Sequence, residues 1–161
     1  GKTRALFMDN LMHAIYSPER SRELLYDYER SYDIITQRQG RSREDLRTLF
    51  IGGGGYVFPR HIRDRWPRGS IQVAEIDPAV TEANFAAFGL KREDVLICGP
   101  GVAVAEPPAL PTPASVSAPG GLGAAVEPRP IQVFHLDARN HVEDLLRLKR
   151  AGHGFEPFDF V

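Results

Sequence analysis

Four consecutive glycines, Gly52, Gly53, Gly54 and Gly55, stand between an apolar run at residues 48–51 and a helical pattern at residues 57–66. Glycine has no Cβ atom, so its backbone can adopt positive φ angles and a ligand can approach it closely. The helix that follows directs its free N–H groups toward whatever lies above the turn. This context of strand, turn and helix favours a nucleotide-binding α/β unit over the alternative, a flexible glycine linker.

Beyond the glycines the chain alternates short apolar runs with helical patterns. Apolar strands joined by helices of this length predict right-handed crossovers and a parallel sheet. We therefore expect an incomplete Rossmann-like α/β domain over residues 41–161. Its further elements are strands at residues 71–76 and 131–136, helices at residues 78–88 and 137–149, and the opening of a fourth strand at residues 158–161.

Residues 1–40 follow a different pattern. Two short apolar runs flank a turn-forming pair at residues 9–10, which predicts a small β-hairpin. A serine, a proline and an acid at residues 17–19 are a helix-start signal, and the apolar stripe that follows ends near Gly40. We expect a hairpin and one helix to precede the sheet.

Residues 99–130 interrupt the alternation of strands and helices. This segment contains eight of the thirteen prolines and almost no charged or aromatic residues. It buries too little apolar surface to offset the entropy of ordering it. The expectation is a flexible insertion, and the alternative is a proline-rich docking segment.

Composition excludes several classes of function. A net charge of -1 gives no electrostatic reason to expect a nucleic-acid partner or a membrane surface. No apolar run approaches the roughly 20 residues that cross a bilayer. The single cysteine, Cys98, cannot form an internal disulfide, so a reducing, cytoplasmic setting is expected. The five histidines lack metal-ligand spacing, which predicts no metal site.

Acidic residues end two of the predicted strands. Glu75 lies 21 residues after Gly54, the spacing at which a carboxylate accepts hydrogen bonds from both ribose hydroxyls of a nucleoside; the alternative is a solvated strand end. Asp137 can accept from an adenine amino group or can simply cap the next helix, as Asp77 is expected to do. The predicted cofactor-binding residues are Gly52, Gly53, Gly54, Gly55, Glu75, Asp137 and Ala138.

In combination these motifs resemble the spermidine synthase (polyamine aminopropyltransferase) family, and most of all a divergent bacterial branch whose members are sometimes fused to transporter-like segments. The resemblance implies a Rossmann-like sheet of the S-adenosylmethionine-dependent methyltransferase type and a homodimer. It also implies aminopropyl transfer from decarboxylated S-adenosylmethionine to a diamine such as putrescine, a step of polyamine biosynthesis. The motifs are residues 49–55, 73–78, 136–139 and 158–161, with residues 6–10 and 26–29 as a weaker match.

The resemblance also locates the amine site. The family supplies a carboxylate that positions the amine and accepts its proton. That residue is expected beyond Val161, so the chain by itself is predicted to be a fragment and a poor catalyst. The family lines the amine site with a tyrosine near Tyr26 and Tyr28, although packing in the core is the alternative for both.

The glycine turn departs from the family pattern at its fourth position. The family has an aspartate there, which binds the ammonium end of the decarboxylated cofactor, whereas this chain has Gly55 followed by Tyr56. A turn of bare N–H groups suits intact S-adenosylmethionine better. Three hypotheses stay open: an aminopropyltransferase, an S-adenosylmethionine-dependent methyltransferase, and a non-catalytic nucleotide-binding remnant.

Overall fold

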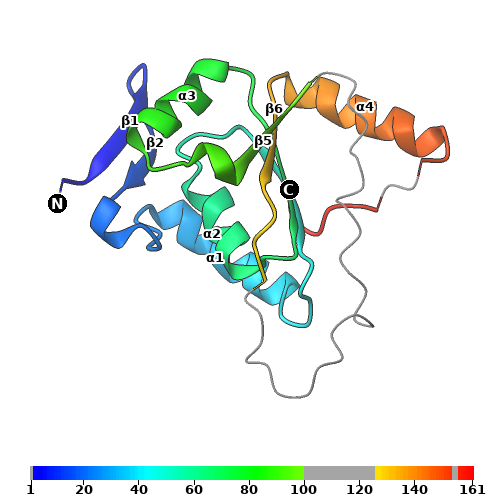
Figure 1. The fold of residues 1–161 in the computed structure, drawn as a ribbon, viewed down its shortest axis with the longest axis horizontal. Helices are drawn as coiled ribbons and strands as arrows, with labels where there is room; N and C mark the ends of the chain where they lie inside the picture. Colours follow the sequence, from blue (N-terminus) through cyan, green and yellow to red (C-terminus); the bar gives the residue numbers. More distant parts are fainter. Residues whose placement is uncertain (1, 100–125, 154–155) are drawn as a thin grey trace.

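The computed structural model describes residues 2–99, 126–153 and 156–161. Its architecture is α/β: a parallel sheet of four strands has helices on both faces, and an antiparallel hairpin stands beside it (Figure 1). This arrangement is compatible with a Rossmann-like fold. The insertion predicted at residues 99–130 falls largely outside the described residues.

The N-terminal hairpin is confirmed. Strand β1 (Arg4–Met8) pairs antiparallel with β2 (Leu11–Tyr16), and Asp9 takes a positive φ of 53° in the turn between them. The predicted helix start at Ser17 is wrong, because only a short 3-10 helix (Pro18–Arg20) forms there and the Ser17 side chain caps nothing. Helix α1 (Asp27–Gln39) begins later, after Leu24, which packs against the core and directs the intervening chain along it.

The predicted parallel sheet is also confirmed. It contains β3 (Arg47–Ile51), β4 (Ser70–Ala74), β6 (Ile131–Phe134) and β5 (Val95–Cys98), in this spatial order and all parallel. Strand β5 was not predicted from the sequence. It has only four residues, directly precedes the proline-rich segment and lies at the edge of the sheet, where Leu96 and Ile97 stay half exposed.

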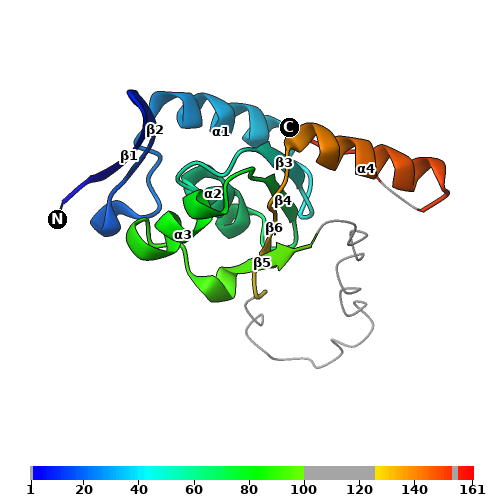
Figure 2. The same ribbon diagram turned by 90° about the horizontal axis from the view of Figure 1, so that it is seen from above.

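Helices cover both faces of this sheet. Figure 2 shows α2 (Val57–Arg65) and α3 (Pro78–Ala87) on one face and α4 (Ala138–Arg150) on the other. The start and stop of α3 follow the prediction: Asp77 Oδ1 accepts a hydrogen bond from the Ala79 N–H, and Gly89 leaves the helix with a φ of 70°. A 3-10 helix (Arg92–Asp94) then leads into β5. No helix in the described ranges combines the length and the apolar character that crossing a membrane requires.

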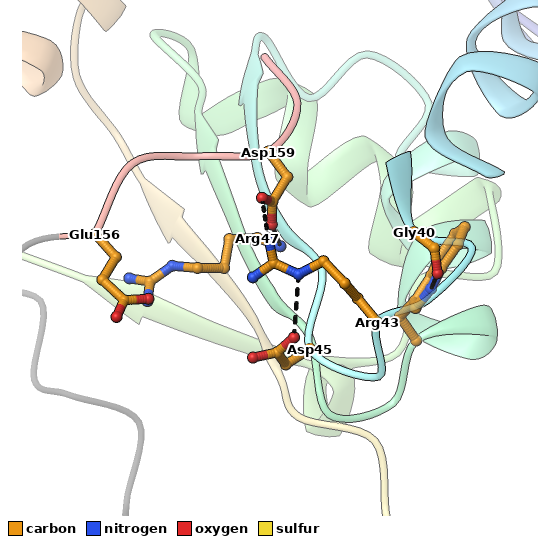
Figure 3. Close-up of polar contacts among 7 residues, drawn as sticks. Gly40, Arg43, Asp45, Arg47, Glu156 and Asp159 are labelled. Atoms are coloured by element: carbon orange, nitrogen blue, oxygen red, sulfur yellow. Dashed lines mark hydrogen bonds and ion pairs between the residues drawn. The ribbon is translucent and has the colours of Figure 1, made fainter. Parts of the chain in front are cut away.

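The C-terminal segment extends the sheet beyond β3. Phe160 forms a parallel bridge with Thr48, as the predicted strand opening requires. Asp159 fixes this segment, since its carboxylate accepts from the Arg47 backbone N–H at 2.9 Å and from the Arg43 guanidinium (Figure 3). The chain thus continues from β3 to β4 and β6 on one side and returns at Phe160 on the other, so the direction of winding reverses at β3.

Two hydrophobic clusters join these layers. The smaller one connects β2 to α2 and α3 through Ala14, Tyr16, Val57 and Phe88. In the larger one Trp66 fills the space beside Gly40, where an added Cβ would lie 2.5 Å from the indole ring. The buried residues of the larger cluster are Leu46, Tyr56, Phe58, Ile62, Trp66, Ile71, Val73, Leu90, Ile131 and Val133.

Candidate functional site

The glycine turn follows the strand at which the winding direction reverses. In open α/β sheets, ligands bind beyond the carboxyl ends of the strands at such a switch point. The turn connects β3 to α2, and the carboxyl ends of β4 and β6 lie beside it through the registers Ile51–Ala74 and Ala74–Phe134. The structure therefore brings residues 52–55, Glu75 and Asp137 together at the edge of the sheet formed by the carboxyl ends of the strands.

Each glycine of the turn has its own structural reason. Gly52 and Gly54 have φ angles of 92° and 49°, which side-chain-bearing L residues rarely adopt. Gly53 packs under a ring, because an added Cβ would lie 2.4 Å from the Tyr56 side chain. A flexible linker would show neither constraint, so that alternative is wrong.

Gly55 is constrained by the hairpin. A Cβ at this position would lie 2.3 Å from the Cβ of Ala14, a residue of β2 that is only 1% exposed. Carbon atoms in contact normally stay about 3.5–4.0 Å apart. The hairpin therefore occupies the space that any side chain at this position would need.

Glu75 braces the turn from the next strand. Its carboxylate accepts from the Gly53 N–H at 2.7 Å and from the Asp77 N–H at 2.9 Å. The residue is 6% exposed, so the alternative of a solvated strand end is wrong. Carboxylate oxygens have further lone pairs, and the ribose contact stays a prediction.

Asp137 caps helix α4. Its carboxylate accepts a hydrogen bond from the Arg139 backbone N–H at 2.8 Å and forms an ion pair with the Arg139 guanidinium at 3.1 Å. The hydrogen bonds from Arg139 lower the pKa of this carboxyl. The capping alternative is confirmed, with Ala138 as the first residue of the helix, and the adenine contact of both residues stays a prediction.

A buried polar chain that sequence reasoning missed lies behind the turn. The Tyr56 hydroxyl lies 2.8 Å from Thr81 Oγ1, which in turn lies 3.1 Å from Nε2 of the partly exposed His135. Tyr56 is fully buried and has a φ of 50°, and burial raises the pKa of its hydroxyl to about 12. The only available signal was an aromatic residue directly after the glycines.

Asn84 holds the turn from helix α3. Its Nδ2 donates to the Gly54 carbonyl at 2.6 Å and to the Val80 carbonyl at 2.8 Å. Glu75, Tyr56 and Asn84 thus fix the turn from three directions. The N–H groups of Gly52 and Gly53 donate to the Ala74 carbonyl and to Glu75, so a ligand over this ordered turn would meet the N–H groups of Gly54 and Gly55.

The tyrosines of α1 form an aromatic row beside this edge. Ring centroids are 4.7 Å apart for Tyr26 and Tyr28, 5.5 Å for Tyr28 and Tyr32, and 5.7 Å for Tyr32 and Phe160. Tyr26 is half-buried, whereas Tyr28 is 42% exposed, so core packing does not account fully for Tyr28. Tyr32 is exposed to a similar degree, at 43%. Partial burial raises the pKa of the Tyr28 hydroxyl to about 12, and the charge of Glu29 adds to this effect.

Within residues 2–99, 126–153 and 156–161 no three His, Cys, Asp or Glu side chains group in a way that could bind a metal ion. The groups that this edge offers to a ligand are a glycine turn, a buried carboxylate and exposed aromatic rings.

Comparison of the chain with models of protein families, with curated proteins and with solved structures finds no match.

Proposed function

We propose that this chain is the cofactor-binding part of a spermidine synthase-like transferase. It binds an S-adenosylmethionine-type cofactor over the glycine turn, and the full-length protein transfers an aminopropyl group from the decarboxylated cofactor to a diamine in polyamine biosynthesis. One observation carries the proposal: the turn follows the switch-point strand and is fixed there by the hydrogen bond from the Gly53 N–H to Glu75.

The position of Glu75 supports an adenosyl ligand. A buried carboxylate beside a glycine turn, at the end of the adjacent strand, is suited to accept hydrogen bonds from both ribose hydroxyls of a nucleoside. The sheet order, with Phe160 on one side of β3 and with β4 and β6 on the other, agrees with the methyltransferase-type sheet that the resemblance implies.

The exposed rings of Tyr28 and Tyr32 suit the charges of the reaction. Aromatic faces attract cations such as a sulfonium or a protonated amine. In the proposed reaction an unprotonated amine attacks the propyl carbon bonded to the sulfonium, the carbon–sulfur bond breaks, and the thioether leaves. The amine proton passes to a carboxylate that acts as the general base.

A methyltransferase that uses intact S-adenosylmethionine is the second candidate. The observation that favours it is the packing of Ala14 against Gly55, which leaves no room for the acid that binds a decarboxylated cofactor. In this case the amine or another nucleophile attacks the methyl carbon of the sulfonium. Both candidates use the same adenosyl site.

Calorimetric titration with both cofactor forms tests the proposal. The chain is expected to bind at least one of them, and the Glu75→Gln variant is expected to bind it at least tenfold more weakly, about 1.4 kcal/mol. Glu82→Gln, which changes an exposed acid of α3 paired with Arg92, is the matched control and should bind normally.

The outcomes separate the candidates. Preference for the decarboxylated form, with formation of a polyamine by the full-length protein, supports aminopropyl transfer. Tenfold tighter binding of the intact form supports methyl transfer instead. Absence of binding to either form refutes the adenosyl site altogether.

A further inference from the structure

Glu29 places a carboxylate in the protein interior with one oxygen unsatisfied. The residue is the third of helix α1 and is only 1% exposed, and its Oε2 has no hydrogen-bond partner among the described residues. Burying an acid without a partner is costly, so such a group in a folded chain calls for an explanation. The cation that faces it is Arg60 of α2, whose Nη2 is likewise buried and unsatisfied within the described part of the chain.

Arg60 connects this pair to the glycine turn. Its Nε donates to the Tyr56 carbonyl at 3.1 Å, and its guanidinium lies 4.8 Å above the Tyr16 ring of β2. Tyr56 is the residue that ends the turn and precedes α2, in a left-handed conformation. A change in the position or effective charge of Arg60 therefore acts directly on the residue that shapes the turn.

We propose that Glu29 is a positioning residue for the cofactor turn, which acts through Arg60 and favours a cationic adenosyl cofactor when it is ionised. The inference rests on the proposed function and adds a regulation of the same site. The reason is electrostatic: a sulfonium cofactor over the turn is repelled by an uncompensated Arg60, and an ionised Glu29 compensates that charge.

The environment of Glu29 sets the pH range of this effect. Burial raises the pKa of its carboxyl from 4.5 to about 7, against the lowering influence of the Tyr26 backbone hydrogen bond and of Arg60. Tyr28 of the same helix also interacts with it, and the Tyr16 ring of β2 lies beneath Arg60. The pKa of Tyr28 is about 12, so that side chain does not titrate near neutrality.

Proton binding to Glu29 and cofactor binding are linked, and the direction of the pH effect on affinity follows from this linkage. If the cationic cofactor prefers ionised Glu29, its affinity rises as the pH increases through about 7, and binding releases a proton below that value. Where only the ionised form binds well, the dissociation constant falls about tenfold between pH 6 and pH 8.

The experiment measures binding of S-adenosylmethionine and of its decarboxylated form by calorimetry from pH 6 to pH 8, in two buffers with different ionisation enthalpies. The wild-type chain should show the tenfold rise in affinity and release protons near pH 7. Glu29→Gln should bind with the weak affinity of the wild type at pH 6, at every pH, and release none. Glu23→Gln, a control on an exposed acid, should keep the wild-type profile.

Two results overturn the inference and leave the proposed function intact: a wild-type dissociation constant that does not change with pH, or an unchanged pH profile in Glu29→Gln. Binding of neither cofactor form at any pH refutes both proposals together. Circular dichroism and thermal unfolding confirm that each variant is folded. If Glu29→Gln does not fold, Arg60→Gln takes its place, with loss of the pH dependence expected and its retention contradicting the inference.

Discussion

Substitution of Gly55 by alanine tests how tightly the hairpin closes the glycine turn. The added Cβ would lie 2.3 Å from the Cβ of Ala14, more than 1 Å closer than the normal carbon contact of about 3.5–4.0 Å. Because Gly55 does not have a positive φ, alanine brings no conformational strain of its own there. The whole penalty should therefore come from displacement of β2.

The magnitude follows from that overlap. Inserting one methyl group into a closely packed interior costs about 1–3 kcal/mol. The same exchange at an unstrained, open position stabilises a protein by about 0.4–1 kcal/mol through the unfolded chain. We expect Gly55→Ala to lower the free energy of unfolding by about 1–2 kcal/mol.

Urea unfolding of a double-mutant cycle measures this effect. Ala14→Gly removes the opposing Cβ, so it should restore at least 1 kcal/mol in the Gly55→Ala background, beyond its own cost as a strand glycine. Gly52→Ala is the control. Its φ of 92° makes it destabilising, but nothing lies within 4 Å of its added Cβ, so Ala14→Gly should give no rescue. Full stability of Gly55→Ala, or equal rescue at both positions, would refute the packing argument.

Three further predictions address other contacts. The pKa of Glu29 rises from 4.5 to about 7 on folding, so the native state binds more protons than the unfolded state in this pH range. Its free energy of unfolding should therefore fall by about 3 kcal/mol between pH 4.5 and pH 8. Urea unfolding of Glu29→Gln should show no such fall, and the same pH dependence in this variant would contradict the burial of the acid. Tyr56→Phe removes the hydrogen bond to Thr81 and should cost about 1 kcal/mol in the same assay, whereas a neutral result would mean that this bond contributes nothing. Asp159→Asn weakens the attachment of the C-terminal segment to β3, so the Leu49 amide, which donates to Phe160, should exchange its hydrogen about tenfold faster by NMR; an unchanged rate argues against the carboxylate as the anchor.

Local sequence signals predicted most of the sheet and its helices. The apolar run before Gly52 and the largely apolar run before Glu75 correspond to β3 and β4, of which β4 is the more fully buried. Asp77 and Gly89 bound α3 through contacts within a few residues. The signal at Ser17 gave only a short 3-10 helix, and Leu24 packs against the core before α1 begins, a tertiary contact that the local sequence does not encode.

The candidate site was predictable only in outline. The glycines and Glu75 follow from spacing, since both end adjacent parallel strands. The contact of Ala14 with Gly55 joins residues of separate elements, and its existence depends on how the hairpin docks. The contacts from Tyr56 through Thr81 to His135 join the residue before α2, a residue inside α3 and the residue after β6, so no sequence periodicity indicates them.

The contact between Ala14 and Gly55 also limits how proteins built this way can diverge. A chain with a side chain at position 55 needs a hairpin that stands further from the turn, and a chain with the hairpin docked as here needs glycine. Neither state is reached from the other by one substitution without loss of stability. An engineer who wishes to place a side chain at position 55 must therefore redesign the hairpin and the turn together.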